Sequence, residues 1–221
     1  MIKPITAIAL TTALCAAFPA AAEVAVKDRA AIRNQPIASN AFAKERFMVR
    51  ARAIYVAPDE SSNLNIGGDL HVSKSVTPEV DLSYFFTDHI AAELIAATSK
   101  HHLEYNGATN IGDAWILPPT ITLQYHFTPN KAFSPYIGAG VNYSFFYGES
   151  SANGFTDLDV HNGLGYAFQA GFDYWLDDHW GVNFDIKKLM LNVNASANNG
   201  VIQADVDLDP WIMGAGVSYR F

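Results

Sequence analysis

Apolar and polar residues alternate with a period of two through most of the chain after residue 46, and this pattern constrains the fold more than any other feature. Successive side chains of a β-strand point to opposite faces, so such alternation is typical of strands that have one apolar face. The pattern appears in eight segments: 47–57, 79–86, 90–97, 120–127, 137–145, 168–176, 180–187 and 211–221. We therefore predict eight strands.

The less apolar face of these strands carries ionisable and amide side chains, whereas the other face is rich in aromatic and aliphatic ones. The polar set is Arg50, Arg52, Glu79, Asp81, Glu93, Gln124, Asn142, Gln169, Asp173, Asn183, Asp185 and Lys187. A soluble β-sandwich also alternates, but its core would then hold the aromatic-rich face with few small residues to interdigitate. A membrane barrel places the polar face in its lumen and the aromatic face in lipid.

The connections between the predicted strands differ in length at the two ends. Three are short (87–89, 128–134 and 177–179) and four are long (58–74, 100–117, 149–163 and 194–207). We therefore predict an all-β fold over residues 47–221: a transmembrane eight-stranded antiparallel up-and-down β-barrel with short periplasmic turns and long extracellular loops. We also expect an aromatic girdle near the short turns, with Tyr136 and Trp175 among its members.

Composition agrees with export and excludes some partners. Charged residues make up 16% of the chain, against roughly 25% in an ordinary soluble domain. The net charge is -8 and Lys and Arg form no cluster, which excludes a nucleic-acid partner. After residue 22 no segment has the roughly 18 uncharged apolar residues of a spanning helix, so a membrane location requires a barrel.

Residues 1–22 have the features of a signal peptide. Lys3 is followed by an apolar stretch over 5–18, and Ala20-Ala21-Ala22 precedes Glu23 as a cleavage site. An uncleaved anchor is the alternative, and the small residues at the cleavage site argue against it. Residues 23–46 are Ala-rich and charged without a clear period, and we predict an N-terminal extension. The expected location is the outer membrane of a Gram-negative bacterium, with its lipid as a partner.

Several segments resemble the OmpW family of eight-stranded outer-membrane proteins. They are AELIAAT (92–98), LPPT (117–120), SPYIGAGVNYSFF (134–146), GFDYWLDDHWGVNFDIK (171–187) and LDPWIMGAGVSYRF (208–221). The resemblance implies passage of small hydrophobic molecules through a narrow barrel. The last three residues look like the aromatic-x-Phe signal that the barrel assembly machinery recognises, so we predict Tyr219 and Phe221 as an assembly signal and that machinery as a partner.

Two histidine-containing motifs are candidates for sites of chemistry. His101 and His102 are neighbours whose side chains would point to opposite faces of a strand and could not chelate one metal together, so we interpret them as loop residues. His71-Val72-Ser73 resembles the His-x-Ser of lipid A deacylases, but it lies on the N-terminal side of the second strand rather than in a late one. We therefore predict no enzymatic activity, no metal and no cofactor.

The lumen of an eight-stranded barrel is just wide enough for its side chains to fill it. Internal ion pairs should therefore block hydrophilic diffusion. With the passage of small hydrophobic molecules that the resemblance to the OmpW family implies, we predict a narrow channel for such molecules. The alternative is a surface receptor or a structural outer-membrane protein without transport activity. An apolar pocket at the extracellular end would favour transport, and its candidate residues are Leu64, Ile66, Leu70, Trp115 and Ile116.

Pro118 and Pro119 stand where the second long connection enters the fourth predicted strand. Two successive prolines remove two backbone donors from the ladder, so pairing with a neighbouring strand must fail locally. We predict a lateral exit there, through which a solute leaves into the bilayer. The alternative is that the prolines only end a loop and stiffen the start of the strand.

Overall fold

The computed structural model describes residues 46–221, so the predicted signal peptide and all but the last residue of the predicted extension lie outside the described residues. The strands are β1 (Phe47–Ala57), β2 (Ser61–Leu64), β3 (Leu70–Val72), β4 (Ser75–Phe85), β5 (Ile90–Ala97), β6 (Ser99–Tyr105), β7 (Thr109–Leu117), β8 (Thr120–His126), β9 (Phe133–Ser151), β10 (Asp159–Val160), β11 (Gly163–Trp175), β12 (Trp180–Ala197), β13 (Ile202–Asp207) and β14 (Trp211–Arg220). Residues 46–221 contain no helix that is long and apolar enough to cross a membrane.

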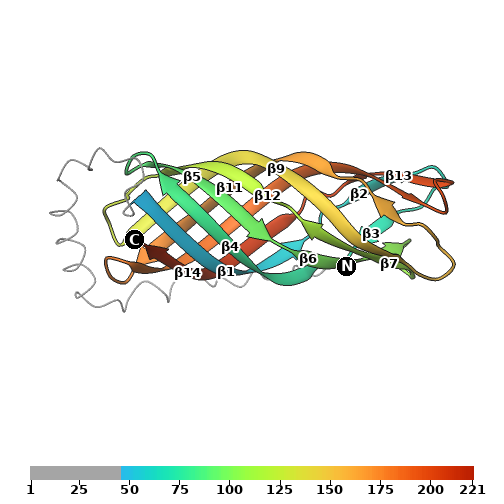
Figure 1. The fold of residues 1–221 in the computed structure, drawn as a ribbon, viewed down its shortest axis with the longest axis horizontal. Coiled ribbons are helices and arrows are strands. Elements are labelled where there is room, and N and C mark those ends of the chain that lie inside the picture. Colours follow the sequence, from blue (N-terminus) through green and yellow to red (C-terminus); the bar gives the residue numbers. More distant parts are fainter. Residues whose placement is uncertain (1–45) are drawn as a thin grey trace, which may run out of the picture.

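Eight of these strands close into an antiparallel barrel in the order β1, β4, β5, β8, β9, β11, β12 and β14 (Figure 1). β1 completes the closure because Val49 pairs with Leu82 of β4 on one side and with Tyr219 of β14 on the other. The eight strands are those that the alternation predicts, so the barrel is confirmed and the sandwich is excluded. Phe221 donates its backbone N–H to the carbonyl of Phe47, which places the start of β1 and the C-terminus at the same end.

The four long connections are not simply loops, because they contain β2, β3, β6, β7, β10 and β13. β7 pairs with the outward extension of β9, as in Ile116 with Phe146, and β10 and β13 pair with that of β12, as in Val193 with Val206. β6 then pairs with β7, β3 with β6, and β2 with β13. They continue the wall of the molecule beyond the barrel, at the end opposite the C-terminus (Figure 1). The sequence of β12 explains why this strand extends beyond the barrel. Its alternation does not stop at Lys187 but continues to Ala197, and the odd-numbered residues stay on the inner face.

Apolar residues are outside and charged residues are inside, the reverse of a soluble protein. On the barrel wall Leu123 is 57% exposed, Val141 49% and Phe168 51%, whereas the side chains of Arg50 and Asp173 are fully buried. A continuous apolar outer face around a closed barrel is the surface that lipid covers.

Aromatic side chains gather on the outer face near the short turns. Tyr84 packs on Phe86 with ring centroids 5.1 Å apart, and Tyr219 packs on Phe221 at 5.0 Å. The prediction that Tyr136 and Trp175 belong to this girdle was wrong, because each is only 1% exposed and points into the lumen. Both stand at inward positions of their strands, where a polar partner is available: Tyr136 donates its hydroxyl proton to Asp185.

Candidate functional site

The part of the lumen nearer the short turns is filled by a network of ion pairs centred on Arg50. Its guanidinium donates two bonds to Asp173, at 3.0 and 2.7 Å, and one to Glu93 at 3.0 Å. Glu93 also accepts hydrogen bonds from Gln169 and Thr122. Bidentate contacts of this kind hold a planar guanidinium in one geometry.

Arg52 and Lys187 extend the network toward the extracellular end. Arg52 lies 2.7 Å from a carboxylate oxygen of Glu79 and 2.6 Å from one of Asp81. Lys187 contacts Asp185 and, at 3.4 Å, Glu79. Some of these pairs join neighbouring strands, such as Arg52 with Glu79, and others cross the lumen, such as Lys187 with Glu79.

All twelve polar residues considered for the lumen are buried on the inside of the wall, and the least buried of them is Gln169, with 5% of its surface exposed. Space for this network comes partly from glycine: a Cβ at Gly138 would lie 2.9 Å from Cγ of Gln169 on the neighbouring strand. The side chains of the network fill the lumen at this level.

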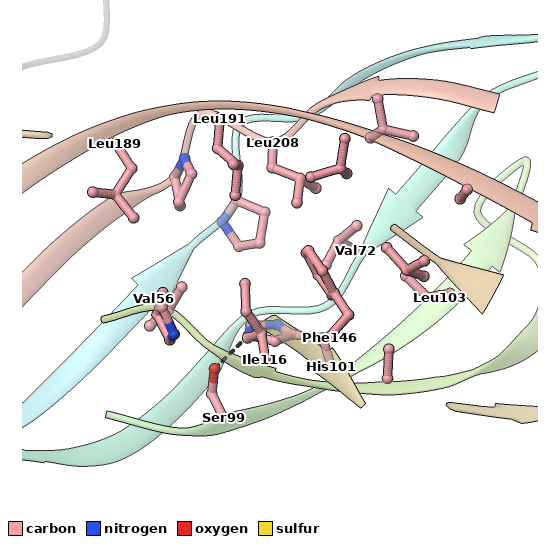
Figure 2. A pocket seen from close by; sticks show the side chains of 18 of the residues that line it. Val56, Val72, Ser99, His101, Leu103, Ile116, Phe146, Leu189, Leu191 and Leu208 are labelled. Atoms are coloured by element: carbon pink, nitrogen blue, oxygen red, sulfur yellow. Dashed lines mark hydrogen bonds between the residues drawn. The ribbon is translucent and has the colours of Figure 1, made fainter. Parts of the chain in front are cut away.

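Above the network the inward side chains change from polar to apolar and surround a cavity (Figure 2). Its empty volume is about 1340 Å³, with its open part included. Ile54, Val56, Leu189 and Ile212 lie at the level just above the ion pairs, and Glu79 and Lys187 reach its floor. Further out the wall is built from Leu64, Leu70, Leu103, Ile111, Ala114, Val160, Leu191, Val193, Ala204 and Val206.

Three of the five residues proposed for an apolar entry lie at this cavity and two do not. Leu64, Leu70 and Ile116 line it. Trp115 is 37% exposed and stacks on Tyr147 instead, because it is the neighbour of Ile116 on β7 and so points to the opposite face. Ile66 is 49% exposed in the turn after β2, where no strand directs it inward.

Ser99 and His101 are polar side chains in the cavity wall, and they are hydrogen-bonded to each other at 2.8 Å (Figure 2). The other ring nitrogen of His101, Nδ1, lies 2.6 Å from the backbone oxygen of Ser73. Burial lowers the pKa of His101 below its usual value, and the bond to Ser73 only partly opposes this effect. His101 is therefore a neutral imidazole at neutral pH.

Pro118 lines the cavity at a place where the ladder is interrupted on one side. The pairing of β5 with β8 ends at Ile95 and Thr120, and the pairing of β6 with β7 begins at Ser99 and Ile116. Among the residues that the structure describes, no ladder pair joins 96–98 to 117–119. On the other side the contact with β9 continues, since Tyr143 donates its backbone N–H to Pro119.

The gap between 96–98 and 117–119 is bridged by a side chain. Thr98 Oγ1 donates to the backbone oxygen of Ile116 at 3.2 Å and lies 2.6 Å from the hydroxyl of Tyr147. Inside the gap, Ala97 and Pro118 face the cavity.

The side chains of the two histidine motifs have separate hydrogen-bond and ion-pair partners. His101 and His102 belong to β6 rather than to a loop, and as strand neighbours they separate: His101 is buried, while His102 is exposed and contacts Asp113. His71 contacts Glu60, and Ser73 Oγ accepts the backbone N–H of His102. Within residues 46–221 no group of three or more His, Cys, Asp or Glu side chains could hold a metal ion.

Lys100 joins the exposed cluster of His102 and Asp113 on the outer face of β6 and β7. Its ammonium lies 2.9 Å from Asp113. The hydrogen bond from Lys100, followed by that from His102, lowers the pKa of the Asp113 carboxyl below its usual value.

The cavity residues of β12 were not identified from the sequence, although a signal was present. Leu189, Leu191 and Val193 occupy the same face as Asp185 and Lys187, and all three are buried. Following the alternation past Lys187 would have shown that the inward face becomes apolar there.

This barrel has relatives among known outer-membrane proteins. The model of the OmpW family matches residues 43–221. The chain belongs to the OmpW family. It is 50% identical over 182 residues to a protein of Sinorhizobium fredii named uncharacterized outer-membrane protein y4mB, covering 79% of this chain and 80% of that one. It is 35% identical over 191 residues to outer membrane protein W of Vibrio cholerae, covering 79% and 88%.

Solved structures of OmpW-type barrels agree with the fold. The crystal structure of the outer membrane protein OprG from Pseudomonas aeruginosa superposes with a TM-score of 0.75 at 31% identity, over 79% of this chain and 95% of that one. The solid-state NMR structure of outer membrane protein AlkL superposes with a TM-score of 0.62 at 22% identity, over 85% and 95%, and supports the fold alone. This OmpW family member is therefore an outer-membrane β-barrel of a Gram-negative bacterium, in contact with membrane lipid.

Proposed function

We propose that this protein takes up small hydrophobic molecules from outside the cell and releases them sideways into the outer membrane. The observation that carries the proposal is the apolar cavity on the extracellular side of a lumen filled by ion pairs. A receptor or a purely structural barrel has no need of such a cavity.

A route sideways into the membrane is more favourable for an apolar molecule than a route along the axis of the barrel. Transfer of apolar surface from water into the cavity is favourable by about 25 cal/mol of free energy per Å². Continuing down the axis would force the same molecule between Arg50, Arg52 and their carboxylates, and these buried groups would have to give up paired contacts. A path that leaves the cavity above this network avoids that cost.

The gap between 96–98 and 117–119 is the exit that we propose. Pro118 and Pro119 cannot donate to a neighbouring strand, and the wall there is bridged by the contacts of Thr98 rather than by ladder hydrogen bonds. Side-chain contacts can open without breaking the barrel, because the pairing with β9 continues on the other side of these prolines.

Replacing both prolines by valine tests the exit. Pro118→Val/Pro119→Val supplies two backbone donors, so the ladder can close, and uptake of a labelled alkane such as nonane by cells should slow while folding stays intact. Pro135→Val is the matched control, because Pro135 lies in a ladder near the short-turn end, paired with Phe172. Uptake should be unchanged in that control.

The outcomes separate the parts of the proposal. Uptake that survives the double substitution but is lost when the protein is deleted would refute the exit and leave transport standing. Uptake that is unchanged by both would refute transport, and a surface receptor or structural role would then be the remaining interpretation.

A further inference from the structure

The bonds of Ser99 and His101 determine what the polar part of the cavity wall can offer a ligand (Figure 2). The backbone oxygen of Ser73 can only accept, so Nδ1 of His101 carries a proton and donates it. In a neutral imidazole the other nitrogen, Nε2, is then an acceptor, and Ser99 Oγ donates its proton to it. The hydroxyl of Ser99 has used its donor and keeps acceptor lone pairs.

The other polar side chains at the inner part of the cavity are already engaged. Thr77 donates to the backbone oxygen of Thr98, and Thr120 donates to Pro118 while it accepts from Asn142. The ammonium of Lys187 is neutralised by Asp185 and Glu79. This part of the wall therefore offers hydroxyl acceptors, at Ser99 and at Thr77, whose protons are already donated within the protein, and no unpaired cation among the residues that the structure describes.

We propose that the cavity selects uncharged molecules that have an apolar body and one hydrogen-bond donor, such as a medium-chain primary alcohol, and that Ser99 Oγ accepts the donor's proton. The inference rests on the proposed uptake function only in taking this cavity as the binding site. Molecules that can only accept a hydrogen bond gain nothing from Ser99, because its proton is held by His101. Carboxylates gain nothing either, and they meet Glu79 at the floor.

The test is equilibrium binding to the full chain, refolded in lipid nanodiscs, with empty nanodiscs subtracted. Four probes of similar length are compared: n-octanol, heptyl methyl ether, nonane and octanoate. After correction for each probe's transfer from water to hydrocarbon, n-octanol should bind about 3- to 10-fold more tightly than the ether or the alkane, as expected for one net hydrogen bond. Octanoate should bind most weakly, and the ring signals of His101 should shift in the NMR spectrum when n-octanol binds.

Variants assign the preference to the pair. Ser99→Ala alone leaves Nε2 of His101 as a second acceptor, so the informative variant is Ser99→Ala/His101→Phe, which removes both and should bind n-octanol no better than the ether. Ser99→Thr keeps the hydroxyl and should keep the preference. Thr120→Val is the matched control, because it removes a lining hydroxyl whose bonds are already satisfied within the protein.

Equal corrected affinities for n-octanol and the ether in the unaltered chain would overturn the inference, whatever the variants do. So would an alcohol preference that persists in a folded double variant, or octanoate as the tightest probe. The binding assay does not involve transport, so its result does not depend on the outcome of the proline experiment. If the cavity is selective but the protein does not transport, only the proposed function is refuted.

Discussion

The ion-pair network makes a quantitative prediction for Arg50→Met. The side chain of Arg50 is fully buried, and its removal leaves Asp173 and Glu93 without their principal cation. Breaking a buried pair by removing one partner costs about 3–5 kcal/mol.

The contacts that remain decide where in this range the cost should lie. Asp173 keeps hydrogen bonds from Ser218 and Asn183, and Glu93 keeps those from Gln169 and Thr122. Because both carboxylates stay partly satisfied, we expect a cost near the lower limit, about 3 kcal/mol, which is roughly a 150-fold change in the unfolding equilibrium constant.

Equilibrium unfolding by denaturant in lipid vesicles, followed by tryptophan fluorescence, measures this change. Adding Asp173→Asn to Arg50→Met should cost less than the sum of the single changes, because the second substitution removes a charge that the first left unpaired. Lys100→Met is the control: Lys100 is 41% exposed in its ion pair with Asp113, and loss of such a surface pair costs at most about 1 kcal/mol. A cost below about 1 kcal/mol for Arg50→Met would mean that water replaces the lost contacts, and it would refute a lumen closed by side chains.

Three further predictions concern other parts of the chain. Val141→Arg puts a charge on the lipid face and should destabilise the barrel by roughly 2–4 kcal/mol, whereas Ile66→Arg in an exposed turn should be nearly neutral in the same unfolding assay. Intact-mass analysis of protein from the envelope should show a mature chain that begins after Ala22; a chain that still begins at Met1 would contradict the signal peptide. Lys100→Met should raise the pKa of Asp113 in an NMR titration, because it removes the stronger of the hydrogen bonds that hold this pKa down, and an unchanged pKa would contradict that assignment.

The sequence by itself determined the eight strands of the barrel and which face of each one meets lipid, although it did not reveal the six short strands in the long connections. Both properties are local, because a period of two fixes where each side chain points relative to its neighbours. Arg50 and Asp173 could therefore be assigned to the inner face from the sequence. The same rule places Tyr136 and Trp175 on the inner face, although their aromatic character suggested the lipid face. The two prolines likewise indicated a weak place in the ladder before any strand partner was known.

Only the tertiary structure decided which inward side chains meet, because closure of the barrel brings together residues that are far apart in the chain. Arg50 and Asp173 are 123 positions apart, and nothing in the sequence around either one selects the other. The same holds for the cavity, whose walls come from β1, β3, β6, β7, β12 and β13 together. The bond of His101 to Ser73 depends on how β6 leaves the barrel beside the start of β4, so the neutral ring and the acceptor that it creates at Ser99 follow from strand pairing rather than from any motif.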